Sequence, residues 1–520
     1  MSTLEANWTT PQLRWRDPQI AAGHQVVVVS TNTLIAFYTK KGDLLPAWLP
    51  IPGKPPPPKW TNPITAAQLF APLASSLAAN LNLPAGVDPV IFGFDAFYDT
   101  RVIFDRHRNR FWIGALAINN NTRMESLGLT PKQRGSRRTK FLLAVSVDED
   151  PRHGWHLYWW DATKDDGAYN YGEDSTGFIF VPGDAGDYPY IGVDAKFLAQ
   201  TNVVGHRDPA TGKKTSRRYA FANIVDANAL AAGGLPPKLE IGKTVPGSVY
   251  APIYDPYGRE FRSAVQPAQH LTNDAWAQLF LVGVLNDPKQ TPHKTEVVIW
   301  TRPWASATLK TRTVPVQPSN DWVAAPQGGD STVPSPAPLK FRNLNAFSVT
   351  YSKGFIHFAF GDSMQSTNGL VEAMRVLRIP AFETTVAGLT NAAKGFIDRR
   401  LPAAKDVWHY GWPALTANAD GDMVLAYQRT SGSTFPEVRY NVWPKEAAGP
   451  EPSHRLQAGQ MPFVDTPDPQ DGTVGDIDMI NIAADPDGKT VWIAHPYPFK
   501  PDGPDPAPSN YRLAVGRVRP

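Results

Sequence analysis

The chain has 520 residues, and its 42% hydrophobic content supplies enough apolar side chains for a large core and excludes intrinsic disorder. Lysine and arginine number 51 against 48 aspartates and glutamates, so the net charge of +3 indicates no nucleic-acid partner. The absence of cysteine excludes disulfides, thiolate nucleophiles and cysteine-ligated metals.

Short strands dominate the predicted secondary structure. The 51 prolines and 40 glycines disfavour a helical bundle, and the 57 aromatic residues (16 Trp, 17 Tyr and 24 Phe) favour β-structure. Helical spacing of Ala and Leu predicts a helix over 65–82, interrupted at Pro72, and shorter helical turns over 226–232 and 389–397. No apolar run is long enough for a signal peptide or a transmembrane helix, so we expect a soluble protein without membrane insertion.

A hairpin unit recurs along the chain. Each copy has an apolar strand, a turn rich in Asp, Asn and Gly, and a second strand that carries aromatic residues. In chain order the copies are Val26–Leu45, Arg101–Leu116, a segment that begins near Pro189, Trp276–Leu285 with Glu296–Thr301, and the segments that begin at Ala346, Pro413 and Met479. Further strand-like runs follow most copies, so the unit contains about four strands.

Four strands repeated about seven times predict an all-β fold, a single β-propeller over residues 1–520. Six or eight blades are the alternatives to seven. Residues 20–45 would form the first hairpin, and the strand 511–518 would join this N-terminal hairpin and close the ring. Two tandem β-sandwiches would require a change of composition near the middle of the chain, and the sequence has none.

The repeats resemble those of bacterial seven-bladed propellers of sialidase-like architecture, which are mostly exported proteins without an assigned role. The resemblance implies an extracellular or cell-surface location. It rests on Asp99–Asp105 with Arg110–Trp112, Ala144–Tyr158, Asp187–Val193, Trp412–Ala417 with Gly421–Asp422, and Asp485–Trp492.

Residues just before the innermost strand of each blade should line one mouth of the central channel. The repeats place six pairs there: Asp99 and Arg101, Asp187 and Tyr188, Gln266 and His270, Arg342 and Asn345, His409 and Tyr410, and Asp476 and Asp478. Carboxylates, arginines and tyrosines are the groups that bind sugars and carry out glycoside chemistry. The same residue types also form turns and packing steps, so each position has a structural interpretation as well.

Three functions follow from this pattern. The leading prediction is a non-catalytic binding or scaffold propeller that recognises a glycan or a protein surface at the channel mouth, with assembly into a larger complex possible. The alternative is a sialidase-like or other glycoside hydrolase that acts through Asp99, Arg101, Tyr188, Arg342 and Asp478. The third and weakest is a four-histidine iron oxygenase of the carotenoid-cleaving type, with ligands from His206, His270, His357, His409 and His495.

No cofactor is predicted, and calcium is the one metal that the turns suggest. Three segments resemble fragments of oxygen-ligand loops: Asn418–Asp422, Asp465–Gly475 and Asp485–Gly488. None has the later glutamate that an EF-hand requires, so tight turns between blade strands are the alternative.

Overall fold

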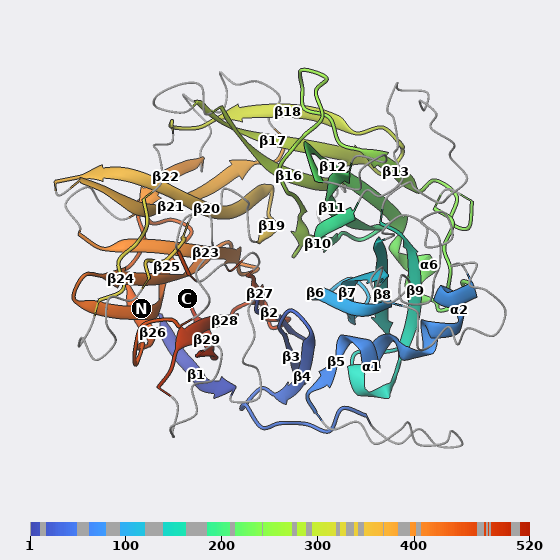
Figure 1. The fold of residues 1–520 in the computed structure, drawn as a ribbon, viewed down its shortest axis with the longest axis horizontal. Helices are drawn as coiled ribbons and strands as arrows, with labels where there is room; N and C mark the ends of the chain where they lie inside the picture. Colours follow the sequence, from blue (N-terminus) through green and yellow to red (C-terminus); the bar gives the residue numbers. More distant parts are fainter. Residues whose placement is uncertain are drawn as a thin grey trace.

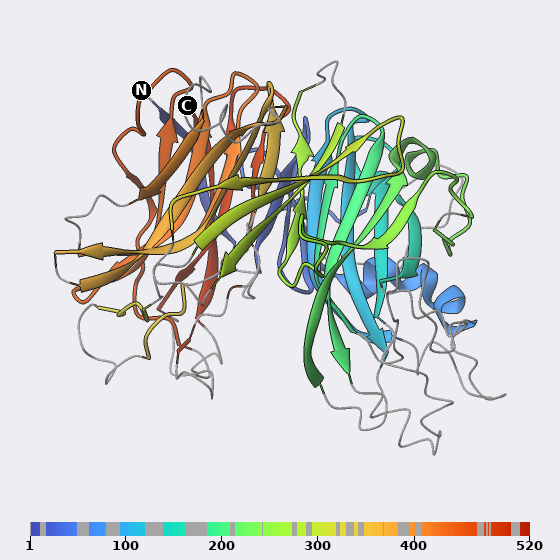
Figure 2. The same cartoon turned by 90° about the horizontal axis from the view of Figure 1, so that it is seen from above.

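The computed structural model places seven β-sheets radially around a centre, which is a seven-bladed propeller (Figure 1). Both chain ends lie on the same side of the molecule (Figures 1 and 2). None of its helices in the described residues has the length and apolar character needed to cross a membrane. The structure describes residues 2–10, 17–48, 62–79, 94–119, 139–162, 185–207, 214–241, 243–272, 278–287, 294–318, 323–328, 337–341, 348–367, 369–382, 396–401, 407–464, 473–474, 477, 480–500 and 510–520.

Six blades have four strands each and one has five, and we number them in chain order. Blade 1 consists of β2 (Gln19–Ala22), β3 (Val26–Ser30), β4 (Leu34–Thr39) and β5 (Ile64–Thr65). Blade 2 consists of β6 (Phe94–Asp105), β7 (Arg110–Asn119), β8 (Thr139–Ser146) and β9 (Trp155–Asp161). Blade 3 consists of β10 (Ala185–Val193), β11 (Phe197–Arg207), β12 (Lys214–Asp226) and β13 (Val249–Pro252).

The remaining blades follow the same order from the centre outward. Blade 4 consists of β14 (Val265–Pro267), β16 (Gln278–Asp287), β17 (Lys294–Pro303) and β18 (Lys310–Pro315), blade 5 of β15 (Gln269–His270), β19 (Val349–Ser352), β20 (Phe355–Ser366), β21 (Gly369–Pro380) and β22 (Ile397–Leu401), blade 6 of β23 (His409–Ala417), β24 (Met423–Ser431), β25 (Thr434–Trp443) and β26 (His454–Gln457), and blade 7 of β27 (Ile482–Ala484), β28 (Val491–Pro498), β29 (Tyr511–Arg519) and β1 (Thr3–Thr10).

Two of the predicted hairpins are offset within their blades. The segments that begin at Trp276 and Glu296 form the second and third strands of blade 4, because the three-residue β14 already occupies the innermost place. The Val26–Leu45 hairpin likewise supplies the second and third strands of blade 1. The other five predicted hairpins correspond to β6 and β7, β10 and β11, β19 and β20, β23 and β24, and β27 and β28.

The N-terminal strand closes the ring, as the sequence predicts, but its residues differ from the expected ones. β29 pairs with Thr3–Thr10, from Thr3 opposite Arg519 to Thr10 opposite Leu513. The expectation that β29 would join the 20–45 hairpin is wrong, because both long strands of that hairpin already have partners within blade 1. Trp8 anchors the added strand, because its ring lies 5.4 Å from that of Trp492 and 6.2 Å from that of Tyr38.

The helical segments are short. The predicted 65–82 segment contains α1 (Ala66–Phe70), the 3-10 turn η1 (Ala71–Leu73) with Pro72 near its start, and α2 (Ala74–Ala79). Thr65 caps α1 through a reciprocal bond with Gln68. Elsewhere lie η2 (Pro151–His153) and α6 (Ala227–Ala231), the latter close to its predicted place. The helical turn expected at 389–397 falls largely outside the described residues, and Ile397 begins a strand.

Aspartate–tryptophan pairs fix the turn between the first two strands in two blades. The carboxylate of Asp105 accepts the backbone N–H of His107 at 2.8 Å and lies 3.3 Å from the indole nitrogen of Trp112. In blade 7 the carboxylate of Asp485 accepts the indole N–H of Trp492 at 2.7 Å. A seven-residue spacing of Asp and Trp therefore links the turn to the buried face of the following strand.

Candidate functional site

A shared backbone distortion occurs within or just before four innermost strands. Asp17, Asp99, Tyr188 and Trp412 have left-handed φ angles of 61°, 57°, 52° and 47°. Each precedes a Pro or a Thr, and the pairing register of β6, β10 and β23 shifts at this point. A left-handed non-glycine residue costs about 1–2 kcal/mol, so the surrounding structure must hold it. Of these residues, Asp17 and Asp99 lie near Arg101, whereas the Trp412 ring is buried in the core against Phe341 and Phe463.

Asn32, in the turn between β3 and β4, ties two of these positions together. Its side-chain nitrogen donates to the carboxylate of Asp17 at 3.2 Å, and its side-chain oxygen accepts the backbone N–H of Asp99 at 2.9 Å. The backbone oxygen of Asn32 also accepts the hydroxyl of Thr100 at 2.9 Å. These hydrogen bonds from blade 1 hold the backbone of β6 at Asp99 and Thr100, directly before Arg101.

A small polar cavity lies among the innermost strands. Its volume is about 40 Å³. A water molecule occupies roughly 10–15 Å³ of such a cavity, so the cavity admits a few waters or one polar group of a larger ligand. Strand β15 runs parallel to β19 as an extra innermost strand of blade 5, and its residue Gln269 lines the cavity. The lining residues are Gln19, Arg101, Val102, Ile103, Tyr190, Ile191, Gln266, Pro267, Gln269, Ser348, Val349, Thr350, Asn481 and Ile482.

Arg101 is the charged group of this cavity. It is only 3% exposed, its Nε donates to the carbonyl of Pro189 at 2.7 Å, and its guanidinium lies 4.1 Å from the ring centre of Tyr190. Burial lowers the pKa of Arg101, while Tyr190, Asp99 and Asp17 act in the opposite direction. Nη2 is buried and has no hydrogen-bond partner among the described residues. The cavity therefore offers one cationic donor to an incoming group.

Two neutral groups in the cavity are also unpartnered. The side-chain nitrogen of Gln266 and the hydroxyl of Thr350 are buried, and neither has a hydrogen-bond partner within the described part of the chain. Both residues are 2% exposed. An unpaired buried polar group costs about 1–3 kcal/mol, so three such groups in one cavity favour a polar occupant.

Polar side chains cross the channel between blades that are not neighbours. Gln269, in blade 5, donates to the carbonyl of Phe104 in blade 2 at 2.8 Å. Asn481, which precedes blade 7, donates to the carbonyl of Val102 at 3.4 Å. These contacts hold the inner strands around the cavity.

The predicted mouth residues occupy different positions. Arg101 and Gln266 line the cavity, and Asp99 and Tyr188 are the distorted residues two positions before the lining residues Arg101 and Tyr190. Asp187 is exposed and accepts the N–H of Tyr188. Arg342, Asn345, Asp476 and Asp478 lie outside the described residues.

The other three predicted mouth residues pack between strands and are not among the lining residues. His270 is 5% exposed and stacks on Phe280 with ring centres 5.6 Å apart. His409 accepts the backbone N–H of Glu372 at 3.3 Å, and burial lowers its pKa to about 4. The ring of Tyr410 lies 5.6 Å from that of Tyr427.

The described histidines do not form a metal centre. Among the described residues, no three histidine, aspartate or glutamate side chains lie close enough to hold a metal ion. Both ring nitrogens of His495 lie within hydrogen-bond distance of backbone carbonyls, those of Trp412 and Pro496, and His357 is buried on the second strand of blade 5. These positions give no support to the four-histidine interpretation; the side chain of His206 is not described.

The two described calcium candidates are turns with internal hydrogen bonds. The side-chain oxygen of Asn418 accepts the backbone N–H groups of Asp420, Gly421 and Asp422, each at 2.9 Å. The Asp487 carboxylate accepts from Thr490 and Arg517. Residues 465–472 of the third candidate lie outside the described part, so calcium binding stays a prediction.

Sequence reasoning missed Tyr190, Thr350 and Asn481. The predicted pairs ended at Tyr188 and Asn345, which is two residues before Tyr190 and five residues before Thr350. Asn481 directly precedes β27, the same position that identified the other candidates. A search extended by two residues would have included Tyr190, and one extended by three residues would have included Asn481.

No protein-family model and no curated protein matches the sequence. Among solved structures, the fold is similar to a Dyadobacter fermentans protein of unknown function at 10% identity, a TM-score of 0.35 and coverage of 81% of this chain and 93% of that chain. It is also similar to a Hadza microbial sialidase (8% identity, TM-score 0.36, 81% of this chain and 65% of that chain). A Trypanosoma rangeli sialidase matches at 9% identity and a TM-score of 0.35, over 82% of this chain and 54% of that chain. The chain thus spans about half to two thirds of the length of these two sialidases, and the likeness concerns the fold alone.

Proposed function

We propose that the protein is a binding propeller that takes a polar ligand, a glycan, at the channel mouth, with one hydroxyl or anionic group inserted beside Arg101. The observation that carries this proposal is that three residues lining one cavity each have a buried, unpartnered polar atom: Arg101 Nη2, Gln266 Nε2 and Thr350 Oγ1. Guanidinium, amide and hydroxyl groups are the partners that sugar hydroxyls and carboxylates use.

The size and rim of the cavity support a ligand that is larger than the cavity. A volume of about 40 Å³ accepts one group of such a ligand, so the rest would lie at the mouth. There, Tyr188 is half-buried against Tyr190 and Val203, and Asp187 is exposed. An aromatic ring beside a carboxylate offers both a stacking face and hydrogen-bond acceptors to a sugar ring.

Labelled protein on a glycan array tests the proposal. The wild type should bind a subset of glycans, and Arg101→Met and Gln266→Leu should each weaken that binding at least about tenfold, because each removes a buried hydrogen bond. Lys489→Ala, an exposed substitution in the turn at the opposite end of an inner strand, should bind like the wild type. Array binding that persists in Arg101→Met, with an unchanged melting temperature, would overturn the channel site. If the ligand is a protein surface and not a glycan, the array should show no binding.

A glycoside hydrolase is the second candidate, and one observation favours it. Asn32 holds Asp17 and Asp99 at one mouth, beside Arg101, and a pair of carboxylates is what glycoside hydrolysis needs. Product analysis of each array hit after incubation with the protein distinguishes the two functions. Release of a shortened glycan that disappears in Asp99→Asn would assign the enzyme, and intact glycan throughout would assign the binder.

A further inference from the structure

Three arginines of blade 6 converge on one glutamate, and we call this group the blade-6 arginine cluster (Arg429, Arg439 and Arg455 around Glu437). The carboxylate oxygen Oε1 of Glu437 accepts Arg429 Nε at 2.9 Å and Arg439 Nη1 at 3.0 Å. Arg455 Nη1 lies 3.7 Å from Oε2. The three guanidinium groups come from three adjacent strands, β24, β25 and β26, so the sheet itself brings them together.

The cluster carries two more positive charges than negative ones. Among the described residues, Glu437 is the only carboxylate that forms an ion pair with any of the three arginines. The side chain of Glu437 is 4% exposed, whereas those of Arg429, Arg439 and Arg455 are 20%, 13% and 61% exposed. Like charges this close repel one another, and an anion on the open side of the cluster would offset that repulsion.

Neighbouring groups hold two of the arginines in place. The guanidinium of Arg429 lies 4.0 Å from the ring centre of Trp408. Arg439 donates from Nε to the hydroxyl of Ser453 and from Nη2 to the carbonyl of Ser453, both at 2.7 Å. A ligand would therefore meet two fixed guanidinium groups and would have to order only Arg455, which keeps the entropic cost of binding low.

We propose that the blade-6 arginine cluster is a binding site for a divalent oxyanion, such as sulfate or phosphate, either free or as an ester group on a larger molecule. Arginine forks match the geometry of such anions through paired N–H donors. The site is separate from the channel, because none of its residues lines the cavity at Arg101. It does not depend on the proposed glycan-binding function.

Equilibrium dialysis with radiolabelled sulfate tests the site. The wild type should bind about one sulfate per chain at the cluster, and sulfate affinity should fall about tenfold in Arg455→Ala, which removes a charge-assisted contact. Arg455 is largely exposed on an edge strand, so this variant should fold normally. Glu437→Gln should bind sulfate more tightly, because it removes the one negative charge of the cluster; a circular dichroism melt checks that it is folded.

Two controls separate this site from other basic groups. Arg519→Ala removes an exposed arginine that pairs with Glu5, and Arg101→Met removes the channel guanidinium. Both variants should retain the sulfate site lost in Arg455→Ala. Absence of sulfate binding, or binding that Arg455→Ala and Arg429→Ala leave unchanged, would overturn the proposal. Comparing inorganic sulfate with a short sulfated oligosaccharide then identifies the source, since tighter binding of the oligosaccharide assigns an ester group.

Discussion

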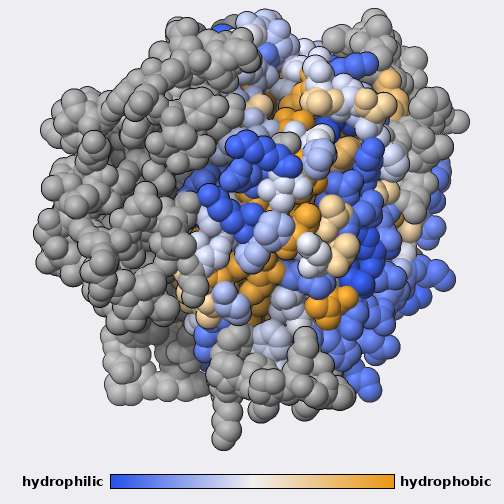
Figure 3. Space-filling model, turned by 90° about the vertical axis from the view of Figure 1, so that its right-hand side faces the viewer, coloured by the Kyte–Doolittle hydropathy of each residue, from blue (hydrophilic) through white to orange (hydrophobic). Residues whose placement is uncertain are grey.

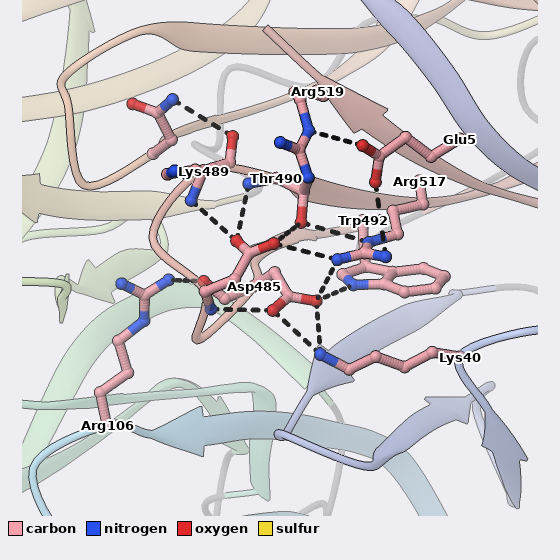
Figure 4. A network of polar contacts seen from close by, with 11 residues as sticks. Glu5, Lys40, Arg106, Asp485, Lys489, Thr490, Trp492, Arg517 and Arg519 are labelled. Carbon is pink, nitrogen blue, oxygen red and sulfur yellow. Dashed lines mark hydrogen bonds and ion pairs between the residues drawn. The ribbon is translucent and has the colours of Figure 1, made fainter.

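Replacing Asp485 should destabilise the closed ring more than any exposed substitution, because this carboxylate connects several parts of it. The side chain is fully buried and accepts Lys40 Nζ from blade 1 at 2.7 and 2.9 Å and the indole N–H of Trp492 at 2.7 Å (Figure 4). The adjoining backbone carbonyl accepts from Arg106 of blade 2. Nearby, Arg517 of β29 pairs with Glu5 of β1 at 3.4 Å. The network thus lies where blades 7, 1 and 2 meet.

The expected loss follows from the groups left behind. Asp485→Ala leaves the indole N–H of Trp492 and the backbone N–H of Asp487 without their acceptor, at about 1–3 kcal/mol each. Removing one partner of a buried ion pair costs about 3–5 kcal/mol, a figure that includes such orphaned donors. Lys40 is 21% exposed and regains water, so the total should be about 4 kcal/mol. Asp485→Asn keeps one acceptor oxygen and should lose about half as much.

Urea unfolding followed by tryptophan fluorescence measures these losses as shifts of the midpoint at constant slope. Asp420→Ala is the matched control, because Asp420 lies in the equivalent turn of blade 6 and is exposed; it should change the unfolding free energy by less than about 0.5 kcal/mol. A loss below about 1 kcal/mol for Asp485→Ala would refute the assignment of this network to ring closure.

Three further outcomes are expected. Burial lowers the pKa of His357 to about 3 and that of His495 to about 4, below the unfolded value of 6.5. The free energy of unfolding should therefore fall by roughly 2 kcal/mol per histidine between pH 7.5 and pH 5, because the unfolded chain binds protons that the folded chain does not. Equal unfolding free energies at the two pH values would contradict this. Deleting residues 1–10 removes β1 and exposes the edge of β29, so the melting temperature should drop and light scattering should reveal association; an unchanged melt would show that β1 contributes little. Because the oxygens of the turns 418–422 and 485–490 accept hydrogen bonds within the protein, we expect neither turn to hold calcium, so any calcium-dependent rise of the melting temperature should persist in Asp420→Ala and Asp487→Ala; a rise that either variant abolishes would contradict this.

The exposed apolar side chains of the described residues indicate no extended docking surface. On the face drawn in Figure 3, hydrophilic side chains surround smaller hydrophobic areas. Among the described residues, the large apolar side chains that are exposed are scattered along the chain: Leu4, Leu44, Tyr257, Val407 and Val464. Isolated apolar residues of this kind are normal on a soluble surface.

The propeller could be predicted from the sequence because each blade repeats one local pattern, an apolar strand, an Asp- or Gly-containing turn and an aromatic strand. The closing partner of β29 was harder to predict, because Thr3–Thr10 is largely exposed and resembles a polar tail. The position of β15 could not be predicted either, since its two residues pair in parallel with a strand that lies 81 positions later, from Gln269 to Thr350. Such long-range pairings leave no local periodicity.

The site was predictable only where side-chain position follows the repeat. Of the predicted residues, Arg101 and Gln266 line the cavity: Arg101 follows the backbone distortion at Asp99 within β6, and Gln266 lies in the three-residue β14. His409 occupies a similar position in the sequence, yet it contacts blade 5, because the backbone distortion at Trp412 comes three residues later in β23. The repeat locates the entry of a strand, and the local backbone then determines which side chain reaches the channel.

The most direct test of the channel site is a crystal structure of the protein soaked with the tightest-binding oligosaccharide from the array. The account predicts ligand density at the channel mouth, with one polar group within hydrogen-bond distance of Arg101 Nη2 and Gln266 Nε2. Density confined to the outer strands or loops, with the cavity at Arg101 holding only water, would contradict it.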